Sequence, residues 1–409
     1  MDRGRAFDVV NQRIVIGNIS AENLVGKYGS PLFVYLASAV RQRINTIKDA
    51  IKYPRLQLSY ALRANSSLAI LRLLYKEGTV VTAASAGEVM TSFKAGFAPH
   101  QILAIADLLT DSEIEFCHDR NVRLSFGSVD AIVRFGSRHR GSEISLRVSP
   151  GKADSGEMAW NDVFGFVPER MDAAAEAVSE YGLRVTGVHA SDSVETTSSG
   201  RIIERLDAVF SAAGRYPDVG YINVGGGLGL PVSSGEEELD IYHFGDVLTK
   251  RMQAGTGNDR RAVTLAVEPG RYLVSDAGYL LMRVIAIRMQ DGVPVAVTDA
   301  STHLLPDIRL HGRPYRLANG SNPAGVEEPV LVAGCATDSG DFFSREPVIM
   351  GEVRVGDIIV VHSAGAYAMA LAGIFNMRPR PAEVLIEEGR DRLVRKRESI
   401  DDILRLQTW

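Results

Sequence analysis

The chain has 409 residues, of which 45% are hydrophobic and 23% are charged, and its formal net charge is −5. These values are ordinary for a globular protein of two domains, and the acidic balance argues against a nucleic-acid partner. Cys117 and Cys335 are the only cysteines, which gives no basis for a disulfide framework. No apolar run approaches the roughly 18 residues of a membrane span, and the first residues show no secretory pattern, so we expect a cytoplasmic protein without a membrane partner.

The N-terminal part is short and mixed. Phe7–Val10, Arg13–Ile16 and Pro31–Tyr35 have the composition of strands, and Ala37–Lys52 has helical spacing. A regular alternation of strand-like and helix-like segments begins only after these residues.

Eight apolar, β-rich runs follow, most of them separated by segments with helical spacing such as Ser67–Glu77, Ser85–Ala95 and Glu169–Tyr181. Eight strands joined by helices predict a (β/α)8 barrel, and the absence of a complete dinucleotide fingerprint disfavours a doubly wound sheet. The expected strands are Gln57–Leu62, Thr79–Ala83, Ile102–Ile105, Val122–Phe126, Glu143–Val148, Val185–His189, Gly220–Val224 and Val263–Val267.

The sequence pattern changes near residue 280, where helical periodicity ends and short strand-like runs alternate with turns rich in Gly, Pro and Asp. This pattern predicts a C-terminal β-sandwich or β-barrel domain that also takes in the N-terminal strands. We therefore expect a barrel over residues 30–280 and a β domain formed by residues 1–29 together with 281–409. Its predicted strands are Leu280–Met289, Val293–Thr298, Pro329–Val332, Asp357–His362 and Ala382–Ile386.

Polar residues and glycines gather directly after the predicted barrel strands. Ligands of (β/α)8 barrels are bound by the loops that follow the strands, so this clustering predicts a binding site there. The residues concerned are Arg63, Asn65, Ser85, Gly87, Glu88, His189, Ser191, Gly225, Gly226, Gly227 and Glu268.

The run Gly225–Gly229 follows the seventh strand. Consecutive glycines let backbone N–H groups face an anion, although a glycine run can equally be a flexible turn. Its place after a late barrel strand favours a phosphate site.

Glu268-Pro269-Gly270-Arg271 follows the last strand. A carboxylate there can bind a protonated ring nitrogen and Arg271 can bind a carboxylate or phosphate, but an internal Glu268–Arg271 salt bridge is the plain alternative.

The histidines of the C-terminal part have no metal-ligand spacing, so no metal is expected.

In combination, several motifs resemble the fold type III pyridoxal-phosphate (PLP) decarboxylases, and diaminopimelate decarboxylase more than ornithine decarboxylase. The resemblance covers roughly residues 30–400 and follows the family's order. It rests on Tyr60–Asn65, Ala84–Glu88, Gly225–Gly229, Glu268–Arg271, Ser339–Asp341, Gly365–Tyr367 and Arg378–Glu383. It implies a cofactor cradle in which the glycine run holds the phosphate, Glu268 the ring nitrogen and Tyr367 a further contact, with Ser85 and His189 nearby.

The resemblance fails at the positions that do the family's chemistry. The lysine that carries PLP as a Schiff base is Arg63 here, and the histidine that stacks on the ring is Ser191. The cysteine and its acidic neighbour, which reach across the family's dimer interface, are Thr337 and Asp338. The family's substrate-binding arginine is missing, with Arg309 nearby but out of register.

Arginine stays protonated and cannot replace lysine as a nucleophile, so the resemblance implies an enzyme that binds PLP non-covalently or does without it. The first interpretation is a repurposed decarboxylase acting on an amino-acid-like substrate. A non-catalytic paralogue that binds a small molecule or a partner subunit is the alternative, and an enzyme without PLP that uses Arg63 and Arg271 to bind an anion is a third. The resemblance also implies a homodimer.

Overall fold

The computed structural model describes residues 8–149, 165–190, 199–231, 238–256 and 263–408, which fold as two compact units. The described residues between 43 and 272 form the barrel unit, apart from Pro231, and those of 8–42 and 273–408 form the β unit. Among these residues no helix has the length and apolar character that crossing a membrane requires.

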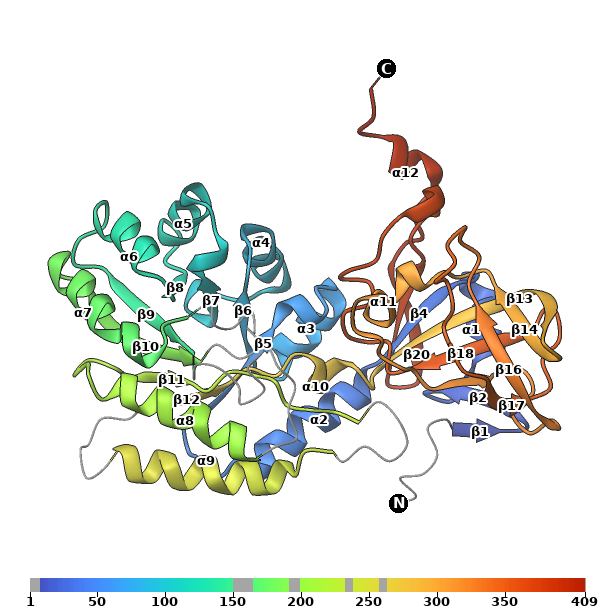
Figure 1. Cartoon of the computed structure of the whole chain (residues 1–409), viewed down its shortest axis with the longest axis horizontal. Helices are drawn as coiled ribbons and strands as arrows, with labels where there is room; N and C mark the ends of the chain where they lie inside the picture. Colours follow the sequence, from blue (N-terminus) through green and yellow to red (C-terminus); the bar gives the residue numbers. More distant parts are fainter. Residues whose placement is uncertain (1–7, 150–164, 191–198, 232–237, 257–262, 409) are drawn as a thin grey trace. The chain divides into compact units, whose positions relative to one another are not determined.

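The barrel unit is built on a closed barrel of eight parallel strands, whose order around the barrel follows the chain (Figure 1). All four residues of β6 and of β7 are buried, as expected for parallel strands that are covered on both faces. The strands are β5 (Leu56–Ala61), β6 (Val80–Ala83), β7 (Ile102–Ile105), β8 (Arg123–Phe126), β9 (Glu143–Val148), β10 (Arg184–Ala190), β11 (Tyr221–Asn223) and β12 (Thr264–Val267).

A helix follows each barrel strand. The side chains of Ser85, Thr110 and Ser128 accept hydrogen bonds from the first turns of three of them and so fix where these helices begin. The helices are α3 (Leu68–Lys76), α4 (Ala86–Ala95), α5 (Asp111–His118), α6 (Val129–Gly136), α7 (Met171–Glu180), α8 (Ser199–Ala213), α9 (Ile241–Thr256) and the short α10 (Arg271–Val274), with α2 (Ala37–Ala50) preceding β5.

The β unit contains a nine-stranded sheet and a small three-stranded sheet. Its core joins Ile14 and Ile16 of the small sheet to apolar residues of the large one, such as Leu281 and Val360. The strands are β1 (Asp8–Val10), β2 (Arg13–Ile16), β3 (Ile19–Ser20), β4 (Leu32–Leu36), β13 (Gly278–Gln290), β14 (Val293–Thr298), β15 (Leu317–Asn319), β16 (Glu327–Ala333), β17 (Val348–Gly351), β18 (Ile358–His362), β19 (Ala382–Glu387) and β20 (Arg390–Arg395), with helices α1 (Ala21–Tyr28), α11 (Asp307–His311) and α12 (Ile400–Leu404).

The predicted fold class, a (β/α)8 barrel with a separate β domain, is confirmed. One strand has an unexpected place. The boundary expected at residue 30 leaves Pro31–Tyr35 with the barrel, whereas β4 pairs with β13 on one side and with β19 on the other.

Candidate active site

The centre of the candidate site is the carboxylate of Glu268, which follows β12 and is only 3% exposed. Its Oε2 accepts hydrogen bonds from Thr82 Oγ1 at 3.0 Å and Asn223 Nδ2 at 3.1 Å, and lies 2.9 Å from His189 Nε2. Burial alone would raise the pKa of Glu268, but the contacts with His189, Arg63 and Thr82 outweigh it and lower the pKa to about 2. A full negative charge is therefore held inside the barrel.

Arg63 lies in a 3-10 turn (Leu62–Ala64) that begins directly after β5. The turn is held by the hydroxyl of Tyr60, which donates to the backbone carbonyl of Asn65 at 3.0 Å. The guanidinium Nη1 of Arg63 lies 3.4 Å from Glu268 Oε1, and its side chain is 37% exposed. Glu268, which follows the last barrel strand, thus pairs with an arginine that follows the first.

Local backbone geometry requires glycine in the run after β11. Gly225 and Gly227 have φ of +76° and +72°, and a Cβ at Gly226 would lie 2.2 Å from the carbonyl oxygen of Glu268. The side chain of Asn223 accepts from the N–H of Gly225 at 2.9 Å while donating to Glu268. The buried Arg205 of α8 donates to the carbonyl of Gly226 at 2.7 Å. This geometry brings the predicted phosphate cradle and the predicted ring-nitrogen partner together.

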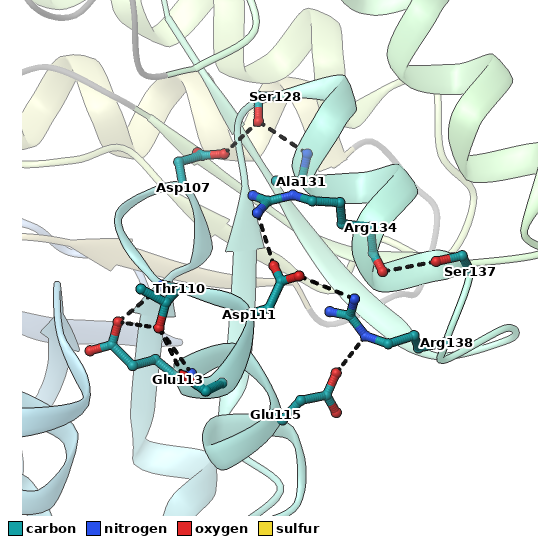
Figure 2. Close-up of polar contacts among 11 residues, drawn as sticks. Asp107, Thr110, Asp111, Glu113, Glu115, Ser128, Ala131, Arg134, Ser137 and Arg138 are labelled. Carbon is teal, nitrogen blue, oxygen red and sulfur yellow. Dashed lines mark hydrogen bonds and ion pairs between the residues drawn. The ribbon is translucent and has the colours of Figure 1, made fainter.

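Two charged residues that the sequence analysis did not single out lie in the same region. Arg147 of β9 has a pKa lowered by burial, against the attraction of Glu268 and Asp107. Asp107 follows β7, accepts a hydrogen bond from Ser128 at 3.0 Å (Figure 2), and has a pKa raised by burial. Thr82 and Asn223 are polar residues near the ends of short, mostly apolar strands, whereas Arg147 is one of three polar residues that alternate along β9.

The described lysines of the barrel unit are all exposed. With the exception of Lys52, which follows α2, they lie on helices that surround the barrel strands. These lysines are Lys48, Lys52, Lys76, Lys94 and Lys250. Within the described part of the barrel unit, therefore, no lysine side chain is buried beside Glu268.

Ser85 has a structural role, because its Oγ accepts from the N–H of Glu88 at 3.1 Å and caps α4. The carboxylate of Glu88 accepts from the N–H of Ala84 at 2.6 Å, and burial raises its pKa. The predicted cofactor contact at Ser191 lies outside the described residues.

Four further predicted site residues belong to the β unit. Asp338 accepts from the N–H of Gly340 at 2.9 Å and pairs with Arg309 at 2.7 Å, and these contacts lower the pKa of Asp338. Thr337 Oγ1 lies 3.2 Å from Asn376 Oδ1. Tyr367 is half-buried and has a φ of 54°, in the left-handed region that residues with side chains rarely adopt. Arg271 of the barrel unit begins α10 and is half-buried.

Sequence comparisons find similar proteins over most of the chain. Residues 37–275 match the family model of the pyridoxal-binding domain of pyridoxal-dependent decarboxylases. The chain is 32% identical to the diaminopimelate decarboxylase of Methanothermobacter thermautotrophicus, over 96% of this chain and 95% of the relative. It is 28% identical to the Escherichia coli enzyme of the same name, over 95% and 97% of the two chains.

Solved structures give the same result. A diaminopimelate decarboxylase structure has a TM-score of 0.86 and 27% identity, over 95% of this chain and 96% of that one. The diaminopimelate decarboxylase of Helicobacter pylori complexed with L-lysine has a TM-score of 0.85 and 25% identity, over 94% and 98% of the two chains.

Proposed function

Because this chain belongs to the pyridoxal-dependent decarboxylases, we propose that it is a repurposed enzyme of the diaminopimelate decarboxylase type, which acts on a small amino-acid-like substrate without a covalently attached cofactor. The observation that carries this proposal is the pairing of Arg63 with Glu268, at the position where the resemblance places the Schiff-base lysine. A guanidinium stays protonated at physiological pH and cannot attack an aldehyde usefully.

The residues of the barrel fit PLP held without a covalent bond. Glu268 is ionised, and its Oε1 has a long contact of 3.4 Å with Arg63, which leaves capacity for a ring N–H. The glycine run with Arg205 behind it fits a phosphate. PLP, when bound, supplies an electron sink for a decarboxylation. Ring binding at Oε1 requires Arg63 to turn away, which its partial exposure permits.

In this proposal the chain's own residues bind and orient the substrate. Arg63, released from Glu268, offers a planar pair of donors to a carboxylate of the substrate. Asn223 and Thr82 keep the Glu268 carboxylate fixed while Arg63 moves. Lysine and other dibasic amino acids are the first candidates for binding, because L-lysine is the ligand named for a similar solved structure.

The same Arg63–Glu268 pair also favours a second candidate function, a non-catalytic paralogue that binds a small molecule or a partner subunit. The guanidinium neutralises the carboxylate that the family uses for its cofactor, and this closed arrangement needs no ligand. An enzyme without PLP, in which Arg63 and Arg271 bind a substrate carboxylate or phosphate, is compatible with the same contacts.

An absorbance titration of the purified protein with PLP tests the proposal. Non-covalent binding gives a saturable spectral change that disappears on dialysis, even after borohydride treatment. Carbon dioxide release from diaminopimelate, lysine and ornithine is then measured with and without PLP. Saturable PLP binding with turnover supports the proposal. The absence of both PLP binding and turnover overturns it in favour of the non-catalytic paralogue. Turnover without PLP supports the enzyme in which Arg63 and Arg271 bind the substrate without a cofactor.

Homodimer formation is part of the proposal. In the resembled family the segment that matches Thr337–Asp341 enters the barrel mouth of the partner, and pairing about a two-fold axis completes both sites. Light scattering at micromolar concentration should give a mass twice that of the 44.4 kDa chain. A monomer under these conditions contradicts this part of the proposal.

A further inference from the structure

Three potential metal ligands meet on the outer helices of the barrel unit, away from Glu268. Glu115 and His118 lie on α5, three residues apart and therefore on one face of that helix, and His139 follows α6. One ligand atom from each of the three side chains lies within 4.8 Å of the others. The ligand atoms of a zinc ion lie about 3.4 Å apart, so small side-chain rotations bring these three atoms to the distances that zinc requires.

The contacts within this cluster leave one polar atom unexplained. His139 Nε2 lies 2.6 Å from Glu115 Oε2, and the rings of His118 and His139 are 3.9 Å apart with an interplanar angle of 35°. The Nδ1 of His118 is buried and has no hydrogen-bond partner among the described residues. Buried polar atoms are normally satisfied, so a missing partner at this place points to a ligand.

The surroundings position the three ligands. Figure 2 shows Arg138 beside Glu115, with its Nε donating to Glu115 Oε1 at 2.7 Å, while Oε2 is the oxygen that contacts His139. The charge of Arg138 is balanced by Asp111, which pairs with both Arg134 and Arg138. Phe135 packs against the rings of both histidines. Such neighbours restrict the orientation of metal ligands.

Two imidazoles and one carboxylate suit zinc and not magnesium or calcium, which prefer oxygen ligands.

We propose that Glu115, His118 and His139 bind one zinc ion that links α5 to the segment after α6. The three side chains are partly exposed, so water completes the coordination. This inference is independent of the function proposed for the barrel interior.

The test titrates ZnCl2 into the full chain, without a histidine tag, by isothermal calorimetry. We expect one zinc per chain and a rise in melting temperature. Co2+ should give the visible absorption of a low-coordinate nitrogen and oxygen site, and Mg2+ should have no effect. H118N and H139Q should each weaken zinc binding by at least roughly tenfold. Removing a residue that merely hydrogen-bonds to a metal ligand already weakens metal affinity by that much.

The matched control is H243N, because His243 is exposed on α9, and it should bind zinc like the wild type. If a histidine variant fails to fold, Glu115→Gln replaces it, since the amide preserves the size of the side chain. Zinc affinity and Co2+ spectra that are the same in wild type, H118N and E115Q overturn the proposal, as does zinc binding that H243N abolishes.

Discussion

The Nη1 atom of Arg63 lies 3.4 Å from Oε1 of Glu268, whereas the sequence offers Arg271 as the plain salt-bridge partner of Glu268. The contact joins a residue that follows the first barrel strand to one that follows the last. These two strands, β5 and β12, pair only because the barrel closes. Barrel closure therefore places the arginine beside the most strongly acidic carboxyl group of the site.

The variant Arg63→Lys tests the role of this position directly. If residue 63 occupies the place of the family's nucleophile, a lysine there should become covalently attached to added PLP, because its amine can be deprotonated. Borohydride should fix the adduct, and peptide mass spectrometry should locate it at residue 63. Arg63→Ala is the control and should form no adduct. If Arg63→Lys forms none and Arg63→Ala retains ligand binding, the site lies elsewhere.

The charge on Glu268 predicts a pH dependence of stability. The pKa of this group falls from its ordinary value of 4.5 to about 2 in the folded protein, so the ionised form stabilises the fold. The contribution is complete above pH 4.5, is lost as the pH falls from there towards 2, and amounts to about 2–4 kcal/mol.

Urea unfolding of wild type and Glu268→Gln from about pH 6 to about pH 3 measures this contribution. Glu268→Gln should lower the free energy of unfolding by about 2–4 kcal/mol near neutral pH, because the amide NH2 group would face hydrogen-bond donors where the carboxylate oxygen accepts. The difference between the two proteins should shrink as the pH falls. The exposed Glu176 on α7 provides the control Glu176→Gln, which should unfold like the wild type. A pH-independent difference would falsify the assignment of the low pKa to Glu268.

Gly226→Ala should disrupt the candidate site by sterics alone. The new Cβ would lie 2.2 Å from the carbonyl oxygen of Glu268, and this neighbour is backbone that cannot rotate away. We expect a loss of about 3 kcal/mol or more in the free energy of unfolding. Gly220→Ala is the matched control, because nothing lies within 4 Å of a Cβ there. Equal stability of the two variants by urea denaturation would contradict the close approach.

Asp341 should be the most sensitive acidic residue of the β unit. It is 3% exposed and accepts hydrogen bonds from Thr302 N, Thr302 Oγ1 and Ala336 N, each at 2.7 Å, and from Ser301 Oγ at 3.0 Å. Asp341→Ala leaves these donors unpaired and should lower the free energy of unfolding by about 3 kcal/mol or more. Glu346→Ala changes an exposed residue nearby and should leave stability unchanged.

Much of the fold could be predicted because strand and helix periods are local signals. Ile102–Ile105 and Glu143–Val148 were expected as strands with the bounds that β7 and β9 have. Arg390–Arg395 forms β20 at the edge of the large sheet, with side chains that are exposed or half-buried, and was not among the expected strands. Few of its side chains are apolar, so the alternation that indicates a strand is weak there.

The candidate site could be predicted only where residues follow strands. Glu268 and the glycine run are such residues, and the structure brings them together. Asn223 and Thr82 lie within apolar strands, where a single polar residue usually satisfies a local hydrogen bond and gives no functional signal. His139 joins Glu115 and His118 only through the packing of neighbouring helices, which sequence spacing cannot show.

The place of β4 has a consequence for how the protein is made. β4 carries residues 32–36, yet its partners in the sheet are residues 278–281 of β13 and 382–386 of β19. In chain order, all the strands of the barrel precede both partners of β4. The barrel can thus fold during synthesis, while the edge of β4 that pairs with β19 stays unpaired until the chain is nearly complete. A nascent chain stalled after the barrel would expose this apolar strand to chaperones and to other chains.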